Sequence, residues 1–339
     1  MVVKWGIIGP GDFARRGIGP ALLEASDTKL TAVYSRSLVR ATEFAKDFNA
    51  DKAYDVFEKF LEDPNIDVVY ISTPNKLHAQ QSILAANYKK HVLCEKPMAI
   101  NLKEGEEMVK TCEKNKVKLG VVFQNRYHPA HIKMRDYIYT GELGEIELAC
   151  VQLCRGFPRN KQINGWRGDP SMTGLGAIVA QGVHPIDLLR FILDSEVDEV
   201  QAMTDKKSPK KSLDEMVYCL LKFKNGVYAT LVSGWYVSNY DNDLRLYGSK
   251  SKIVCTGTLG IPRPGQIGEM ILQNDSCQNK INYPVITQNN KMCRLVEEFN
   301  KHIIKNTKFD TNGYNGLQMI KIANAISESA QKGKRIKLD

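Results

Sequence analysis

The first 125 residues alternate short apolar runs with amphipathic segments. A short apolar run without polar alternation is typical of a strand buried on both faces, as in a parallel sheet. Strands that alternate with helices in this way predict a parallel, doubly wound sheet. The predicted strands are Val2–Ile8, Leu30–Tyr34, Asp67–Ile71, Val92–Cys94 and Lys118–Phe123, and the predicted helices include Ala41–Phe48, Phe57–Leu61 and Leu102–Asn115.

The pattern changes after Ala130, where apolar and polar positions alternate with the period of half-buried strands. The pairs Asn225-Gly226 and Gly248-Ser249 are turn signals that join neighbouring strands as hairpins. A largely antiparallel sheet is therefore expected. Its predicted strands are Glu145–Arg155, Val197–Thr204, Met216–Phe223, Val227–Trp235, Leu244–Tyr247, Lys252–Cys255 and Glu269–Leu272, with helices at His131–Thr140, Ala177–Ile192, Arg294–Lys305 and Gly316–Gln331.

Length and composition indicate a globular protein of about two domains. The chain has 339 residues, of which 43% are hydrophobic and 25% charged. We expect a cytoplasmic protein without a membrane span, because the start lacks a signal peptide and no apolar run approaches the roughly 20 residues that cross a bilayer. The eight cysteines show neither C-x-x-C pairs nor zinc spacing, which predicts reduced thiols and no metal site.

The formal net charge of +9 raises the possibility of a nucleic-acid partner. Basic residues are, however, interspersed with acidic ones along the predicted helices, as on solvated surfaces. Two clusters stand out: the four lysines within Lys206–Lys211 are expected in a loop, and Lys332–Lys337 in a tail. Because no nucleic-acid-binding motif accompanies them, the charge favours solubility and anionic small molecules over nucleic acid.

A glycine-rich turn follows the first predicted strand. It reads Gly9-Pro10-Gly11-Asp12-Phe13, and a helical segment continues to about Ala25. Strand, glycine turn and helix form the dinucleotide-binding fingerprint, in which backbone N–H groups approach a pyrophosphate.

The second strand ends in polar groups without an acid. Enzymes that bind the free ribose hydroxyls of NAD usually have an acid roughly 20 residues after the glycines. This chain has Ser35-Arg36-Ser37 there, with Arg40 on the next helix. A guanidinium beside hydroxyl donors suits a phosphate, so NADP is favoured and NAD stays possible. The alternative is a solvent-facing arginine at a helix start.

Two further strand ends carry candidate groups. Small polar residues at Ser72-Thr73-Pro74-Asn75 could contact the nicotinamide ribose, and His78 follows on the next helix, where a structural role is the alternative. Glu95-Lys96-Pro97 ends the run Val92–Cys94. A lysine at the ligand edge of such a sheet is a candidate proton carrier, and the alternative is a surface lysine in a turn.

A last chemical segment lies at Trp166-Arg167 and within the apolar helix predicted at Ala177–Ile192. His184 and Asp187 share one face if this helix continues past Pro185. A core histidine, with an aspartate that pairs with Arg190, is the alternative.

These segments together resemble the glucose–fructose oxidoreductase / inositol dehydrogenase / MocA-like (Gfo/Idh/MocA) family over nearly the whole chain. The resemblance rests on the order of GIIGPGDFA, STPN, CEKP, WRGDP, GVHPIDLLRF and GSKSKI. It implies a Rossmann domain at 1–125 and, at 126–339, a substrate-binding and oligomerisation α+β domain with an open, mostly antiparallel sheet. The last helices are expected to pack on that sheet or back toward the first domain.

The resemblance also implies a function. Lys96 and His184 match residues that face the substrate carbon, while Trp166 and Arg167 match positions that contact NADP in the anhydrofructose reductase branch. A family aspartate is replaced by Ala180, which leaves the substrate class open. We expect hydride transfer between NADP(H) and a sugar, polyol or related hydroxy or keto compound, in a homodimer or homotetramer.

Lys96 would then carry the substrate proton, with His184 as second candidate. Three alternatives stay open: a keto-sugar reductase like 1,5-anhydrofructose reductase, a non-catalytic NADP-binding regulator, and a hydrolase with a transient redox cycle. The remaining candidates are Glu95 and Gln124 for the cofactor, and Arg126, Tyr127, Arg155, Asp187 and Tyr236 for the substrate.

Overall fold

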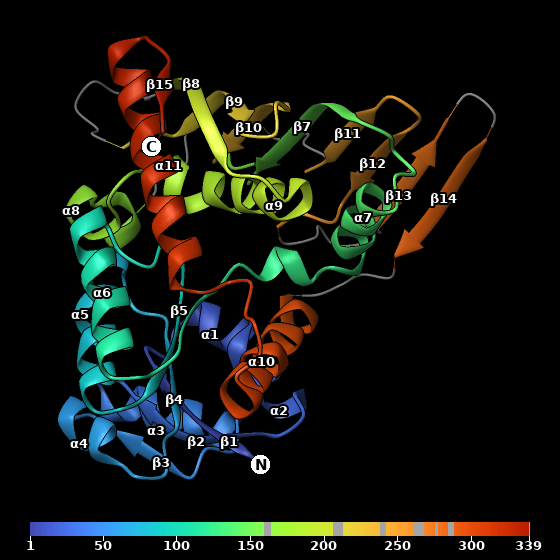
Figure 1. Cartoon of the computed structure of the whole chain (residues 1–339). Coiled ribbons are helices and arrows are strands. Elements are labelled where there is room, and N and C mark those ends of the chain that lie inside the picture. Colours follow the sequence, from blue (N-terminus) through green and yellow to red (C-terminus); the bar gives the residue numbers. More distant parts are fainter. Residues whose placement is uncertain are drawn as a thin grey trace. The chain divides into compact units, whose positions relative to one another are not determined.

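The computed structural model describes residues 1–158, 164–205, 213–237, 242–260, 268–274, 277–283 and 288–338, without the side chains of 282, 283, 288 and 289 (Figure 1). The predicted lysine cluster at 206–211 lies outside these residues. The chain divides into two compact units. Unit 1 comprises Met1–Gln124 and Gln288–Ile320, and unit 2 comprises Asn125–Thr287 and Lys321–Asp339. Unit 1 thus includes the segment Gln288–Ile320, which lies within the expected second domain 126–339 and covers the last helices, expected to pack on the sheet or back toward the first domain.

Unit 1 is built on a six-stranded sheet in the order β3-β2-β1-β4-β5-β6. All neighbouring strands are parallel, which confirms the doubly wound sheet expected from the buried apolar runs. The strand order reverses between β1 and β4, and ligands bind at such a switch point, beyond the carboxyl ends of the strands. The strands are β1 (Val3–Ile8), β2 (Thr28–Tyr34), β3 (Lys52–Tyr54), β4 (Val68–Ile71), β5 (His91–Cys94) and β6 (Leu119–Val121).

The helices of unit 1 follow the strands in alternation. The helix expected after the glycine turn is two helices, because Gly17 interrupts it with non-helical backbone angles. Asn101 caps α6 by accepting a hydrogen bond from the Glu104 backbone N–H, as N-terminal asparagines do. The helices are α1 (Asp12–Arg16), α2 (Ile18–Glu24), α3 (Leu38–Asp47), α4 (Phe57–Glu62), α5 (Asn75–Asn87), α6 (Leu102–Lys114) and α10 (Gln288–Lys305).

Helix α10 joins unit 1 through buried side chains. Trp5 of β1 is fully buried, its indole N–H donates to Asn300, and its ring packs near Phe299. Beyond the helix, the Val121 N–H donates to the Thr311 carbonyl, 2.7 Å away, and the chain thereby covers the β6 edge. Burial of these aromatic rings explains why a segment so late in the sequence belongs to the first sheet.

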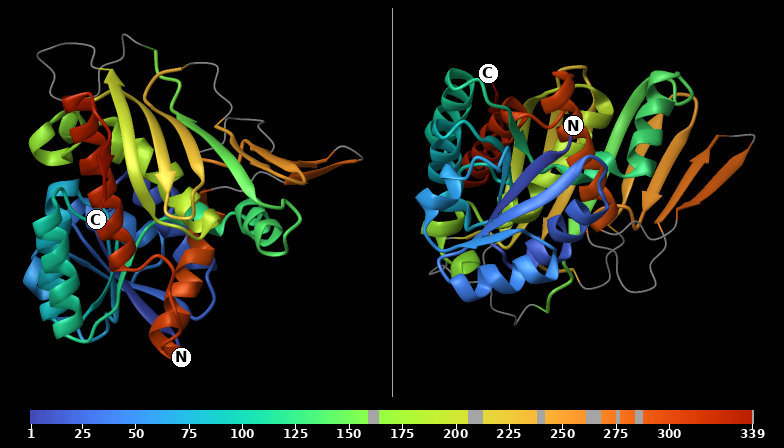
Figure 2. Two further views of the ribbon diagram at one scale, coloured as in Figure 1. Left: turned by 45° about the horizontal axis from the view of Figure 1, so that its top comes forward. Right: turned by 90° about the horizontal axis from the view of Figure 1, so that it is seen from below.

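Unit 2 contains a nine-stranded sheet in the order β14-β13-β12-β11-β7-β10-β9-β8-β15 (Figure 2). The two predicted hairpins, β9–β10 and β11–β12, are present and antiparallel. Among the described strands of this sheet, β7 and β10 run parallel, and the other neighbouring pairs are antiparallel. The strands are β7 (Ile146–Cys154), β8 (Val197–Asp205), β9 (Met216–Phe223), β10 (Tyr228–Gly234), β11 (Leu244–Gly248), β12 (Lys252–Thr256), β13 (Gly268–Gln273), β14 (Gln278–Tyr283) and β15 (Ile336–Lys337).

Helices of unit 2 contact one face of this sheet. The 3-10 turns are η1 (Gln124–Tyr127) and η2 (Gly165–Gly168), and the helices are α7 (Pro129–Tyr139), α8 (Pro170–Thr173), the π-helical segment η3 (Ile178–Gly182), α9 (Val183–Leu193) and α11 (Gly313–Lys332), which the unit boundary divides. Segment η3 contacts β9 and β10, and α9 contacts β7.

One stretch within the described residues, Pro170–Leu193, is long and apolar enough to cross a membrane by length and composition. The expectation that no apolar run reaches this length is therefore wrong. Of the most apolar 18-residue window in this stretch, 72% is buried inside the structure, as is also typical of the core helix of a globular unit.

Candidate functional site

The carboxyl ends of the unit 1 strands bring four predicted turns to one edge of the sheet. Gly9 follows β1, Ser35 follows β2, Ser72 follows β4 and Glu95 follows β5. Backbone hydrogen bonds hold the turns together: the Gly9 N–H donates to Tyr34, and the Ser72 N–H donates to Ile8. The cofactor candidates of the first domain are thus neighbours along this edge.

The glycine turn has the backbone that a dinucleotide site needs. Gly9 has a φ of +90°, and a Cβ there would lie 2.9 Å from the Ser72 carbonyl oxygen. Gly11, at the start of α1, differs, because a Cβ there would meet no atom within 4 Å. The open space over Gly11 lets a pyrophosphate come close to the backbone, so the turn fits such a group.

The turn after β2 presents two exposed arginines, Arg36 and Arg40. Ser37 caps α3 by accepting from the Arg40 N–H, and Ser35 Oγ accepts from the Ser37 N–H. Burial raises the pKa of Tyr34 at this strand end, the Arg36 charge opposes that rise, and the acids Glu58 and Asp55 add to it. The sequence prediction did not include these two acids, which follow β3 rather than β2.

The turn after β4 is fixed by side-chain hydrogen bonds. Thr73 donates from its hydroxyl to Gln81, and both ring nitrogens of His78 lie 2.8 Å from backbone carbonyl oxygens, those of Thr73 and Pro97. His78 is buried, and burial lowers its pKa. The structure therefore places this predicted cofactor residue between two turns, where a neutral imidazole donates one N–H at a time.

The turn after β5 holds Lys96, which is half-buried and precedes a cis peptide bond to Pro97. Glu95 is buried beside it. The Tyr70 hydroxyl donates to Glu95 Oε1 over 2.5 Å, and the Lys96 backbone N–H donates to Glu95 Oε2 over 3.3 Å. Burial raises the pKa of Glu95 to about 7, although the hydrogen bond from Tyr70 and the Lys96 charge act against the rise. Tyr70 was not among the predicted site residues.

His184 lies in unit 2, in the first turn of α9, and is half-buried. The π-helical segment η3 directly precedes it and includes Ala180. Single π-helical turns are frequent at functional sites, because the extra residue shifts the side chains that follow. Asp187, predicted as a substrate residue, is one turn further along and is buried.

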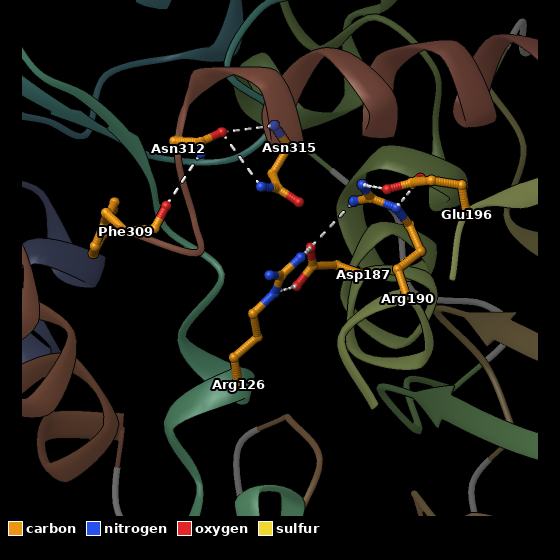
Figure 3. Close-up of polar contacts among 7 residues, drawn as sticks. All are labelled: Arg126, Asp187, Arg190, Glu196, Phe309, Asn312 and Asn315. Atoms are coloured by element: carbon orange, nitrogen blue, oxygen red, sulfur yellow. Dashed lines mark hydrogen bonds and ion pairs between the residues drawn. The ribbon is translucent and has the colours of Figure 1, made fainter. Parts of the chain in front are cut away.

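Asp187 belongs to a buried ion-pair network (Figure 3). Arg126 of η1 donates to both of its carboxylate oxygens, over 2.8 and 2.5 Å. Arg190 lies 3.6 Å from the same carboxylate and donates to Glu196 over 2.7 and 2.6 Å. Burial acts to raise the pKa of Glu196, but the ion pair with Arg190 lowers it overall. Two predicted substrate residues, Arg126 and Asp187, are thus joined to each other.

The other predicted residues of unit 2 lie on η1, on η2 and just after the neighbouring strands β7 and β10. The Arg167 guanidinium stacks on the Trp166 ring, 4.4 Å from its centroid, and Arg155 lies over Phe157. Tyr236 is buried and Tyr127 half-buried.

Two polar features remain. Gln124, the last residue of the first segment of unit 1, is buried. Also in unit 1, Asn312 donates to the Phe309 carbonyl and accepts from Asn315 (Figure 3). Across the described part of the chain, no group of three or more His, Cys, Asp or Glu side chains could hold a metal ion.

Family models match both parts of the chain. The Gfo/Idh/MocA oxidoreductase family model, with an NAD-binding Rossmann fold, matches residues 3–123, and the model of the Gfo/Idh/MocA C-terminal domain matches residues 131–254. Among curated relatives, the 1,5-anhydro-D-fructose reductase of Ensifer adhaerens is 31% identical over 252 residues, which cover 74% of this chain and 75% of the relative.

Solved structures share the whole fold. The aldose-aldose oxidoreductase of Caulobacter crescentus has a TM-score of 0.90 at 23% identity and covers 100% of both chains. A levoglucosan dehydrogenase, solved in complex with NADH and levoglucosan, has a TM-score of 0.88 at 22% identity, with 99% of each chain covered. At these identities the two structures bear on the fold alone.

Proposed function

The chain belongs to the Gfo/Idh/MocA family of oxidoreductases, and on that premise we propose that it transfers hydride between NADP(H) and a carbon of a sugar, polyol or related keto compound. The observation that carries the proposal is the turn after β5, where Lys96 follows the buried Glu95 at the ligand edge of the parallel sheet. The 31% identity to a 1,5-anhydro-D-fructose reductase supports a keto-sugar as substrate class.

The residues that would hold the dinucleotide follow from the four turns. The backbone of Gly9–Phe13 would bind the pyrophosphate, because a Cβ at Gly9 is sterically excluded and the space over Gly11 is open. The turn Ser72–Asn75 would hold the nicotinamide ribose. When bound, the nicotinamide ring supplies the hydride chemistry.

NADP is the proposed cofactor in preference to NAD. The exposed guanidinium groups of Arg36 and Arg40 lie at the end of β2, where the adenine ribose is bound in this fold. No acid follows β2 directly, and guanidinium groups bind phosphate oxygens with charge-assisted hydrogen bonds. Two acids also act on this strand end: Asp55, which follows β3, and Glu58 of α4 raise the pKa of Tyr34. Their negative charges oppose those of the arginines, so the size of the preference for NADP is to be measured.

The chain's own chemical task is to move one proton at the substrate oxygen. Lys96 is the proposed carrier: as an ammonium it donates to a carbonyl oxygen being reduced, and as an amine it accepts from an alcohol being oxidised. His184 is the proposed second group; it lies in the first turn of α9, which follows the π-helical segment η3. Trp166 and Arg167 are proposed cofactor contacts, and Arg155, Tyr127 and Tyr236 are proposed to line the substrate site.

A homodimer or homotetramer is proposed through the open face of the nine-stranded sheet. Cross-strand neighbours on this face leave large apolar side chains exposed, among them Met203, Tyr218, Leu220 and Tyr228, with exposed fractions from 41 to 74%. An apolar patch of this kind is typical of a protein–protein interface.

The test is a screen of sugars, polyols and keto-sugars with NADP(H) and NAD(H), in which turnover is monitored by the absorbance of the reduced nicotinamide. The proposal predicts turnover with at least one such compound and tighter binding of NADPH than of NADH. Tight dinucleotide binding without turnover on any of them would contradict it and favour a regulator.

A further inference from the structure

Tyr70 and Glu95 lie on the same face of the unit 1 sheet. In the parallel pairing of β4 with β5, Tyr70 is opposite Leu93, and residues directly opposite in parallel strands point to one face. Glu95 lies two positions beyond Leu93 and therefore has the same orientation. The long tyrosine side chain reaches this diagonal neighbour, and its hydroxyl donates to Glu95 Oε1.

This pair is buried next to the proposed proton carrier. Tyr70 is fully buried and Glu95 is 8% exposed. The other Glu95 oxygen accepts from the Lys96 backbone N–H, so both oxygens of the carboxyl group are engaged on the protein side.

Charges at Glu95 and Lys96 act on each other. Burial raises the pKa of Glu95, and the Lys96 charge lowers it. Because the interaction between two charges is reciprocal, an ionised Glu95 favours the ammonium form of Lys96 by the same free energy.

The other titratable groups around the pair carry little charge near neutral pH. Burial raises the pKa of the Cys94 thiol at the end of β5, and it raises the pKa of Tyr70 well above its usual value. On α5, burial lowers the pKa of His78, and the Lys96 charge lowers it further. Glu95 supplies a negative charge that acts on Lys96.

We propose that Glu95, held by the Tyr70 hydroxyl, is a positioning residue that keeps Lys96 in its ammonium form. This inference rests on the proposed role of Lys96 as proton carrier. The ionised carboxylate favours the protonated form of Lys96. Lys96 thereby retains a proton to donate to a carbonyl oxygen, and the pair biases the site toward reduction.

The test measures Lys96 directly and needs neither substrate nor cofactor. The apoprotein is treated with trace acetic anhydride across pH 6 to 11, and the acetylation of Lys96 is followed by peptide mass spectrometry. Only the neutral amine reacts, so the pH profile of the rate gives the midpoint of its titration. Glu95→Gln is expected to move that midpoint down by about one pH unit, the size typical of losing a neighbouring opposite charge.

Two further variants sharpen the result. Tyr70→Phe keeps the ring and removes the hydrogen bond that holds the Glu95 carboxylate beside Lys96, so the midpoint should move in the same direction by a smaller amount. Tyr70→Phe also tests the proposal if Glu95→Gln does not fold. Glu107→Gln removes one charge from an exposed position of α6 and should leave the midpoint unchanged.

The inference is overturned if the Glu95→Gln profile, or the Tyr70→Phe profile where only that variant folds, coincides with that of Glu107→Gln. A failure of the underlying proposal is seen separately, because Lys96→Met would then turn over substrate at the rate of the unmodified protein. A shifted profile together with an inactive Lys96→Met supports both.

Discussion

Replacing Asp187 by alanine should strongly destabilise unit 2. The carboxylate accepts two hydrogen bonds from Arg126 and lies 3.6 Å from Arg190, and the side chains are 6%, 2% and 3% exposed for Arg126, Asp187 and Arg190. Loss of one partner of a buried ion pair leaves uncompensated charge in a medium that solvates it poorly. Such a loss typically costs about 3–5 kcal/mol in the free energy of unfolding.

Two contacts that the substitution leaves in place put the expected loss of unfolding free energy near the lower end, about 3 kcal/mol. Arg190 keeps two hydrogen bonds to Glu196, a residue that is partly open to solvent. The Arg126 guanidinium also lies 5.3 Å from the centre of the Phe191 ring, a contact that the substitution retains. A loss of about 3 kcal/mol corresponds to a fall of about 6–12 °C in the melting temperature of a unit of this size.

The assay is urea and thermal unfolding followed by circular dichroism. The matched control is Glu328→Gln in α11, which removes an acid from an exposed i,i+4 pair with Lys332 and should cost less than about 0.5 kcal/mol. The double variant Arg126→Met, Asp187→Leu removes both charges and should be more stable than Asp187→Ala. If Asp187→Ala and Glu328→Gln have equal melting temperatures, the buried pair does not stabilise the unit as reasoned here.

Three further predictions follow from other parts of the structure. Arg36→Asp should weaken NADPH binding and largely spare NADH binding, because it replaces an exposed guanidinium at the end of β2 by an anion. Fluorescence titration with both dinucleotides checks this, and equal affinities of the unmodified protein for NADPH and NADH would count against it. Tyr228→Glu combined with Leu220→Glu should yield a species smaller than the unmodified protein in analytical ultracentrifugation, since both side chains are exposed on the open sheet face. An unmodified protein that is already monomeric at micromolar concentration would refute the proposed assembly. The pKa of Glu95 is about 7 in the folded protein against an ordinary value of 4.5, so the folded state holds this proton more tightly, and the stability that it contributes is lost as pH rises from about 4.5 to 7. Glu95→Gln should therefore flatten the plot of melting temperature against pH over this range. An unchanged slope would argue against a buried, titrating carboxyl.

Local signals in the sequence predicted the parts of the site that depend on a few neighbouring residues. The turn at Gly9 is one, because the strand, the glycine and the helix that follow one another define it. The turn at Lys96 is another, because Pro97 ends the apolar strand just beyond it. The doubly wound sheet followed from the same alternation of buried runs, and it is confirmed.

Elements defined by distant pairing escaped prediction. Strands β3, β14 and β15 are short or largely polar, and they exist because a neighbouring strand offers hydrogen bonds. The parallel pairing of β7 with β10 likewise depends on chain far away in sequence. Helix α10 begins at Gln288, six residues before the predicted start. The prediction missed this start because the first turn is polar and the buried apolar stripe begins only at Met292.

The same limit applies to the candidate site. Tyr70 lies within an apolar run and resembles a core residue in sequence, although its position two residues before a turn could have marked it as a neighbour of Glu95. Arg126 and Asp187 are 61 residues apart, so their pairing could not be derived from either segment alone. Both were candidate substrate contacts in the sequence, and the structure shows that they pair with each other.

The measurement that tests the central claim most directly is the turnover of Lys96→Met with the compound found in the substrate screen, with NADPH binding measured in parallel. General acid–base help is worth about 10² to 10⁴ in rate, so turnover should fall by that factor. The dissociation constant for NADPH should stay close to that of the unmodified protein, because the proposed contacts to the pyrophosphate and adenine ends lie in the turns after β1 and β2. Near-normal turnover of Lys96→Met across the pH range would contradict the claim that this lysine carries the proton.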